Sequence, residues 1–328
     1  MAAVASAAVW CRLAGVEAGA AGCGTAVGIW LAWMEHAATA LALGCLAWKA
    51  TGRWFLGLAA GCLMMVHPLG VEDVAAGNEG TTGRWFLMLA IPAFGWWRAL
   101  RRQGKRGGKT AGVFVFGVLL LGFASAGLVR SGAALADGVV DAASVRSDAL
   151  AWWFRGLRYL AIPWPLNVAP AAPSGGEWAG VFWLAALVWM AWTLRKTAPE
   201  ASAGLGWIVA AGLCVSGLFW RMERPGAESS LAWMVPGFAL AVGFVLDRQG
   251  PGRARWWGLW LLLATYGALT WMRLGQWESA EKLWAAAALQ NPGSTAALER
   301  LAVFREAAGD GEGAETFREA ARNIPSGR

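Results

Sequence analysis

Long apolar segments alternate with short polar loops along the first 273 residues of the chain. The segments are apolar on all sides and most are close to the length that crosses a bilayer, so we expect a helix at each one. Eight such segments are present, at about 25–48, 54–67, 85–97, 111–129, 178–194, 203–220, 230–246 and 256–273. The second and third are short for a crossing, and they either extend into their loops or stop inside the bundle. The pattern therefore predicts an all-α, polytopic membrane helix bundle over residues 25–273. Residues 1–24, rich in Ala and Gly, are expected to form an extracytoplasmic segment or a partial helix.

Basic residues follow every second apolar segment, and the acidic residues lie in the remaining loops. Because Lys and Arg mark cytoplasmic loops, both chain ends are expected outside the cytoplasm. The pattern predicts an integral protein of a bacterial inner membrane, with membrane lipid as a partner. The basic loops contain Lys49 and Arg53; Arg98, Arg101, Arg102, Lys105, Arg106 and Lys109; Arg195 and Lys196; and Arg248, Arg253 and Arg255.

The composition agrees with a membrane interpretation and excludes some functions. Only 15% of the residues are charged, against about 25% in an average soluble protein. The net charge of +7 comes mainly from loops beside apolar segments, so we expect no nucleic acid partner. The five cysteines form no CxxC pair, and we expect no metal site. Many of the 24 Trp residues flank the apolar segments, where indole rings favour the headgroup zone of a bilayer.

Residues 274–328 differ from the rest, because charged residues return at helical spacing. Two sets of small, aromatic, small and proline residues recur there with a 33-residue offset, as in the second helix of a tetratricopeptide repeat. The expected packing residues are Ala280, Trp284, Ala287 and Pro292 in the first set and Gly313, Phe317, Ala320 and Pro325 in the second. This tail is either a stabilising appendage or a surface that docks a protein partner.

Ionisable residues inside or next to the apolar segments are the candidates for chemistry. Glu35 and His36 lie in the middle of the first segment, where a polar pair either has a function or satisfies itself and nearby backbone. His67 precedes a loop with three carboxylates, and this group suits acid–base catalysis, metal binding or simple solvation. The carboxylates are Glu72, Asp73 and Glu79.

Five sequence stretches, taken together, resemble the membrane O-mannosyltransferases that carry tetratricopeptide repeats, a family with the GT-C glycosyltransferase fold. The stretches are EHAA at 35–38, VHPLGVEDV at 66–74, RYL at 158–160 with PWPLN at 163–167, ESSLAWMVPGF at 228–238, and the region from 276 onward. The resemblance implies transfer of a sugar from a polyprenyl-phosphate carrier to an extracytoplasmic acceptor in cell-envelope or protein glycosylation. Apart from that donor, it implies no cofactor.

The resemblance also assigns roles, and it has gaps. Arg155 and Arg158 are placed where they would meet a lipid phosphate. The family's catalytic acid lies in its first outer loop, so here the acid–base candidates remain His67 and the carboxylates that follow it. The first helix and the acidic first loop of the family have no counterpart, and Ser229 and Ser230 replace its Arg and Tyr. We therefore expect a degenerate or truncated relative, and whether it is an enzyme stays open. The alternative is a non-enzymatic membrane scaffold that docks partners through its tail.

Overall fold

The computed structural model of the chain describes residues 26–69, 153, 155–163, 177–215, 231–250, 252–277 and 279–324. Within these ranges all regular structure is helical, as the sequence predicts. The elements are α2 (Ala26–Thr51), α3 (Trp54–Val66), α8 (Glu177–Leu194), α9 (Pro199–Val215), the short 3-10 helix η3 (Ala232–Met234), α11 (Val235–Arg248), α12 (Arg253–Gln276), α13 (Ala280–Gln290), α14 (Thr295–Ala307) and α15 (Gly311–Arg322).

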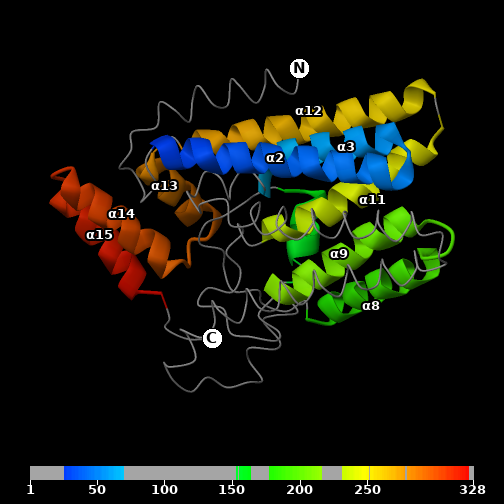
Figure 1. The fold of residues 1–328 in the computed structure, drawn as a ribbon. Coiled ribbons are helices and arrows are strands. Elements are labelled where there is room, and N and C mark those ends of the chain that lie inside the picture. Colours follow the sequence, from blue (N-terminus) through cyan, green and yellow to red (C-terminus); the bar gives the residue numbers. More distant parts are fainter. Residues whose placement is uncertain are drawn as a thin grey trace.

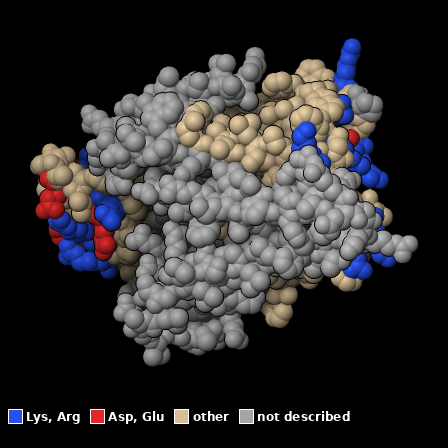
Figure 2. Space-filling model, viewed as in Figure 1, with Lys and Arg blue, Asp and Glu red and all other residues tan. Residues whose placement is uncertain are grey.

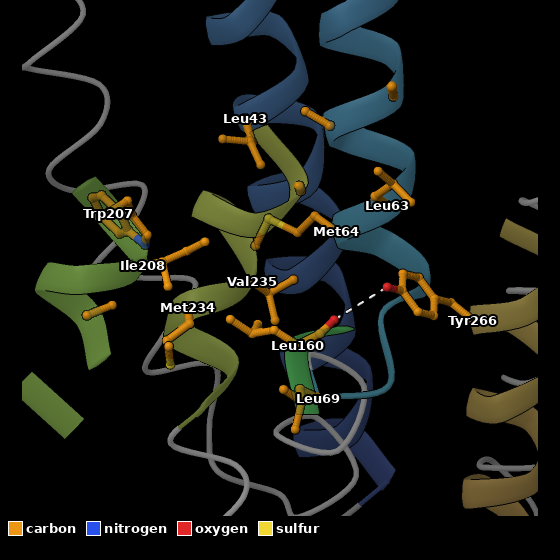
Figure 3. Close-up of a cluster of buried hydrophobic side chains, with 14 of the residues drawn as sticks. Leu43, Leu63, Met64, Leu69, Leu160, Trp207, Ile208, Met234, Val235 and Tyr266 are labelled. Atoms are coloured by element: carbon orange, nitrogen blue, oxygen red, sulfur yellow. Dashed lines mark hydrogen bonds between the residues drawn. The ribbon is translucent and has the colours of Figure 1, made fainter. Parts of the chain in front are cut away.

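The helices before residue 277 form a bundle in which α11 has the central position (Figure 1). On one side α11 packs against α3, which also contacts α2 and α12. On the other side α11 packs against α9, which contacts α8. Large side chains from α3, α11 and the segment 155–161 meet in the interior, among them Leu63, Leu160 and Val235 (Figure 3). These three side chains are at most 2% exposed, so the bundle has an apolar core.

Glycines set how closely the helices approach at two contacts. A Cβ atom built on Gly57 of α3 would lie 2.5 Å from the carbonyl oxygen of Gly44 in α2. At the second contact, a Cβ on Gly237 of α11 would lie 2.5 Å from the carbonyl oxygen of Gly204 in α9. Both distances are too short for a side chain, so these backbones touch because glycine is present.

The turn between α2 and α3 follows from its sequence. Gly52 adopts a φ of 75°, a conformation that glycine accepts without steric cost. The Thr51 hydroxyl donates to the Ala47 carbonyl at 2.7 Å and accepts from the Arg53 amide at 3.1 Å. The single threonine therefore satisfies backbone groups on both sides of the turn.

The predicted multi-pass membrane bundle is wrong, because no helix in the described ranges has the length and apolar character needed to cross a bilayer. Helices α3, α8, α9 and α11 have 13, 18, 17 and 14 residues, fewer than the roughly 20 that a crossing needs. The longer helices α2 and α12 include polar residues such as His36, Thr39 and Thr270. The predicted GT-C-like architecture of eight spans and the predicted integral inner-membrane location depend on such crossings, so they are wrong for the same reason. The predicted segments 85–97 and 111–129 lie outside the described residues.

Helices α13, α14 and α15 form the tail, which lies beside the bundle (Figure 1). Each helix begins with a side-chain cap, in which Ser279, Ser294 and Asp310 accept from the amides of Lys282, Ala297 and Gly313 at 3.1, 3.2 and 2.9 Å. Helix α14 packs against α13 on one side and α15 on the other. Such caps stabilise a helix by about 1 kcal/mol each, which favours three short helices with well-defined starts.

The buried alanines of the tail differ in part from the predicted ones. Ala287 of α13 is buried as expected, whereas Ala320 of α15 is exposed and its neighbour Ala321 is buried. Ala287 and Ala321 are 34 residues apart, which is the usual length of a tetratricopeptide repeat. In α15 the buried alanine is therefore one position later than the predicted one. Trp284 and Phe317 are half-buried, Gly313 is half-buried, Pro292 is exposed in the turn after α13, and Ala280 and Pro325 lie outside the side chains that the structure describes.

Candidate functional site

The most enclosed polar group of the described bundle surrounds His67, which follows the last residue of α3. The side chain is fully buried. Its Nε2 lies 3.0 Å from the Leu160 carbonyl oxygen, and its Nδ1 accepts from the Leu69 amide at 3.3 Å. Because Nδ1 accepts, Nε2 must carry the proton and donate, so the imidazole is neutral with both nitrogens engaged.

Helix α12 closes the site from another side. The Tyr266 ring lies 5.0 Å from the His67 ring, and its hydroxyl approaches the carbonyl oxygens of Leu160 and Ala161 at 3.4 and 3.3 Å (Figure 3). One turn further along α12, the Thr270 hydroxyl donates to the Val66 carbonyl at 2.8 Å. These bonds connect α3, the segment 155–161 and α12, which are far apart in the sequence.

Burial controls the ionisation of the site. The pKa of His67 is lowered from 6.5 to about 4. Removal from water is the largest cause, the hydrogen bond to the Leu160 carbonyl opposes it in part, and the nearby His36 adds to the lowering. Burial likewise lowers the pKa of His36, with partial opposition from the backbone at Met64 and Met65. Burial raises the pKa of Tyr266 to about 12. All three groups are therefore uncharged at neutral pH.

This arrangement supports a structural role for His67. A general base needs an unoccupied lone pair near its substrate, whereas the Nδ1 lone pair of His67 already accepts from a backbone amide. A metal ligand would need the same lone pair and further donors. No group of three or more His, Cys, Asp or Glu side chains in the described ranges could hold a metal ion.

Of the other predicted candidates, His36 lies near enough to His67 to lower its pKa. Glu72, Asp73 and Glu79 lie outside the described ranges, as does the side chain of Glu35. His36 is half-buried in α2, and its Nε2 has no hydrogen-bond partner. On the segment 155–161, Arg155 is half-buried, while Arg158 is exposed with its guanidinium 5.2 Å from the centre of the Tyr159 ring.

The sequence did not indicate two groups that the fold brings together. Tyr266 and Thr270 were assigned only to an apolar segment, although they are polar residues one turn apart on the same helix face. At the opposite end of the bundle, Asp247 lies 3.6 Å from Arg53 and 3.8 Å from Arg255. The available signal was the one acid in an otherwise basic loop.

The tail forms a second candidate site, with a charged surface (Figure 2). Arg305 of α14 pairs with Glu281 of α13 at 3.3 Å, and Arg318 of α15 pairs with Glu306 of α14. Exposed ion pairs of this kind contribute little stability, usually below about 1 kcal/mol. Both charges of each pair stay accessible to solvent, so a partner could replace these internal ion pairs with ion pairs of its own.

Helix α14 also has a solvent-facing stripe on the side away from its buried residues. Leu298, Leu301 and Ala302 are buried on one side of the helix. The opposite side carries exposed residues at helical spacing, namely Ala296, Glu299, Arg300 and Val303. We call these four residues the α14 stripe. It combines one acid, one base and an exposed apolar side chain, Val303, at 54% exposure.

Comparisons of the chain with protein-family models, with curated proteins and with solved structures found no match.

Proposed function

We propose that the chain is a docking protein that binds a segment of a protein partner on the α14 stripe. The observation that carries this proposal is the exposure of Val303 between Glu299 and Arg300, on the side of α14 opposite its buried face. An apolar side chain flanked by both charges is suited to an amphipathic segment with one apolar anchor. Binding would bury the anchor against Val303 and pair its charges with the stripe.

The neighbouring helices support such a surface. The guanidinium of Arg300 lies 5.9 Å from the ring centre of Trp284 in α13, which limits its freedom before any partner binds. The caps of α13, α14 and α15 fix where each helix starts. A surface that is ordered in advance loses less entropy on binding. Repeat proteins use their stacked helices for peptide recognition in this way.

The resemblance to sugar transferases leads to a different function, which stays a prediction. Its candidate acids Glu72, Asp73 and Glu79 lie outside the described residues. His67, the candidate that is described, has both ring nitrogens in hydrogen bonds to backbone. Docking is therefore the function with direct support in the described geometry.

A peptide-display selection against the full chain tests the proposal. Peptides that bind should be enriched in an apolar residue flanked by charges, and their affinity is then measured by titration calorimetry. Val303→Asp should weaken binding at least about tenfold, because it puts a charge where the anchor is buried. Val245→Asp on α11 is the matched control, because Val245 is 58% exposed and lies in the bundle. Equal loss in both variants, or no enriched peptide, would refute docking on the α14 stripe.

A further inference from the structure

Three helix turns meet at the end of the bundle opposite the tail. They are the α2–α3, α8–α9 and α11–α12 turns, and a small apolar cluster that includes Ala47, Ala198 and Phe244 holds them together. Lys and Arg side chains gather on this side of the molecule (Figure 2). We call the basic side chains of the three turns the basic end: Lys49, Arg53, Arg195, Lys196, Arg248, Arg253 and Arg255.

Acidic residues neutralise only part of the basic end. Along the three turns, Asp247 and Glu200 are the two acids within the described residues. Asp247 lies between Arg53 and Arg255, at 3.6 and 3.8 Å, and is itself 13% exposed. This internal group links the α2–α3 turn to the α11–α12 turn. The remaining five cations are exposed, namely Lys49, Arg195, Lys196, Arg248 and Arg253.

Exposed indole rings accompany these cations on each turn. The ammonium of Lys49 lies 4.7 Å from the ring centre of Trp48, and the guanidinium of Arg195 lies 3.2 Å from that of Trp192. On the third turn, Trp257 is 72% exposed. Water-exposed indoles cost free energy, so their presence on all three turns indicates a surface that is covered when the protein functions.

We propose that the basic end binds the headgroup layer of an anionic phospholipid surface. Lys and Arg attract lipid phosphates, and Trp rings favour the level of the headgroups. The cations and the indoles are on the same three turns, so a lipid surface that contacts these turns meets both kinds of side chain. Binding takes place at headgroup depth and needs no helix to cross the bilayer. Nucleic acid fits less well, because a single strand stacks on successive rings along one groove, whereas these rings are on separate turns.

Flotation of the full chain with lipid vesicles tests this proposal. The vesicles consist of phosphatidylcholine alone or of phosphatidylcholine mixed with phosphatidylglycerol. The chain should float with the mixed vesicles and much less with the neutral ones, and added salt should reduce binding. Replacing Lys49, Lys196 and Arg253 together by Gln should weaken binding about a hundredfold, since each surface cation contributes roughly fivefold. These side chains are exposed, so the variant should keep its helices, which circular dichroism measures.

A matched variant distinguishes the effect of the basic end on lipid binding from the effect of the protein's net charge. A variant with Gln at Arg305, Arg318 and Arg322 removes the same charge from the tail, outside the α14 stripe, and should leave flotation unchanged. Replacing Trp192 and Trp257 by Ala should weaken binding to the mixed vesicles while keeping its salt dependence. Equal binding to neutral vesicles, or equal loss in the two charge variants, would overturn the proposal. Stronger binding to a single-stranded oligonucleotide than to the mixed vesicles would overturn it in favour of nucleic acid.

Discussion

The buried imidazole of His67 should make the bundle sensitive to mild acid. Its pKa is about 4 in the folded protein and 6.5 when the side chain is exposed to water. As the pH falls, the unfolded chain therefore binds a proton before the folded one. The stabilising effect is complete above about pH 6.5 and is lost as the pH falls toward 4. At 1.36 kcal/mol per pKa unit, the full loss is about 3 kcal/mol.

The replacement His67→Gln isolates this effect. The Gln amide supplies a donor for the Leu160 carbonyl and an acceptor for the Leu69 amide but does not titrate. Free energies of unfolding in urea are measured for both proteins from about pH 7 to about pH 4.5. The wild type should lose roughly 2–3 kcal/mol more than the variant over this range. His36 is present in both proteins, so apart from its electrostatic coupling to His67 its own titration affects both alike.

Two results would refute this reasoning. If both proteins lose stability in parallel, His67 is not held neutral by the fold. If the variant is more sensitive to acid than the wild type, the sign of the pKa shift is wrong.

Two further predictions concern packing, each with a paired control. Gly237→Ala should destabilise the bundle by about 1–3 kcal/mol, because the new Cβ would lie 2.5 Å from the Gly204 carbonyl oxygen. The control is Gly267→Ala in α12, where the new Cβ has nothing within 4 Å; it should stabilise the bundle by about 0.4–1 kcal/mol. Urea unfolding measures the free energy of both variants, and equal effects would contradict the close contact between α9 and α11. In the tail, Ala321→Asp should lower the midpoint of unfolding because that side chain is buried, whereas Ala320→Asp should leave it nearly unchanged. The reverse order in thermal unfolding would contradict the burial of Ala321 in place of Ala320.

Helix positions could be predicted well where apolar composition and turn residues agreed. The expected segment 178–194 corresponds to α8 (Glu177–Leu194), and 54–67 corresponds to α3 (Trp54–Val66). Between α2 and α3, Thr51 and Gly52 form the turn that the change in composition indicated. Local sequence was sufficient here because helix ends depend on neighbouring residues.

The membrane architecture could not be inferred safely from the same segments. An apolar run of 13 or 14 residues suits a buried helix of a compact bundle as well as a short crossing. Helices α3 and α11 are of this kind, and Phe55, Leu63 and Val235 are buried between helices. Composition alone does not say what surrounds an apolar helix.

The contacts of the site could not be predicted either, because they join residues that are far apart in the sequence. His67 was identified from its neighbours in the sequence, but its bonding partner Leu160 is 93 positions away, and Thr270 reaches Val66 across 204 positions. A pattern within one helix carries no information on such pairs. In the tail, the sequence did not indicate which small residues of α15 are buried, because Gly313 and Ala314 both have the small size that the pattern requires.

The central claim, docking on the α14 stripe, is tested most directly by hydrogen exchange of the full chain with and without a peptide selected against it. The backbone amides of α14 around Val303 should exchange more slowly when the peptide is bound, while those of α8 and α9 keep their rates. Slower exchange confined to the bundle helices, with α14 unchanged, would contradict the claim.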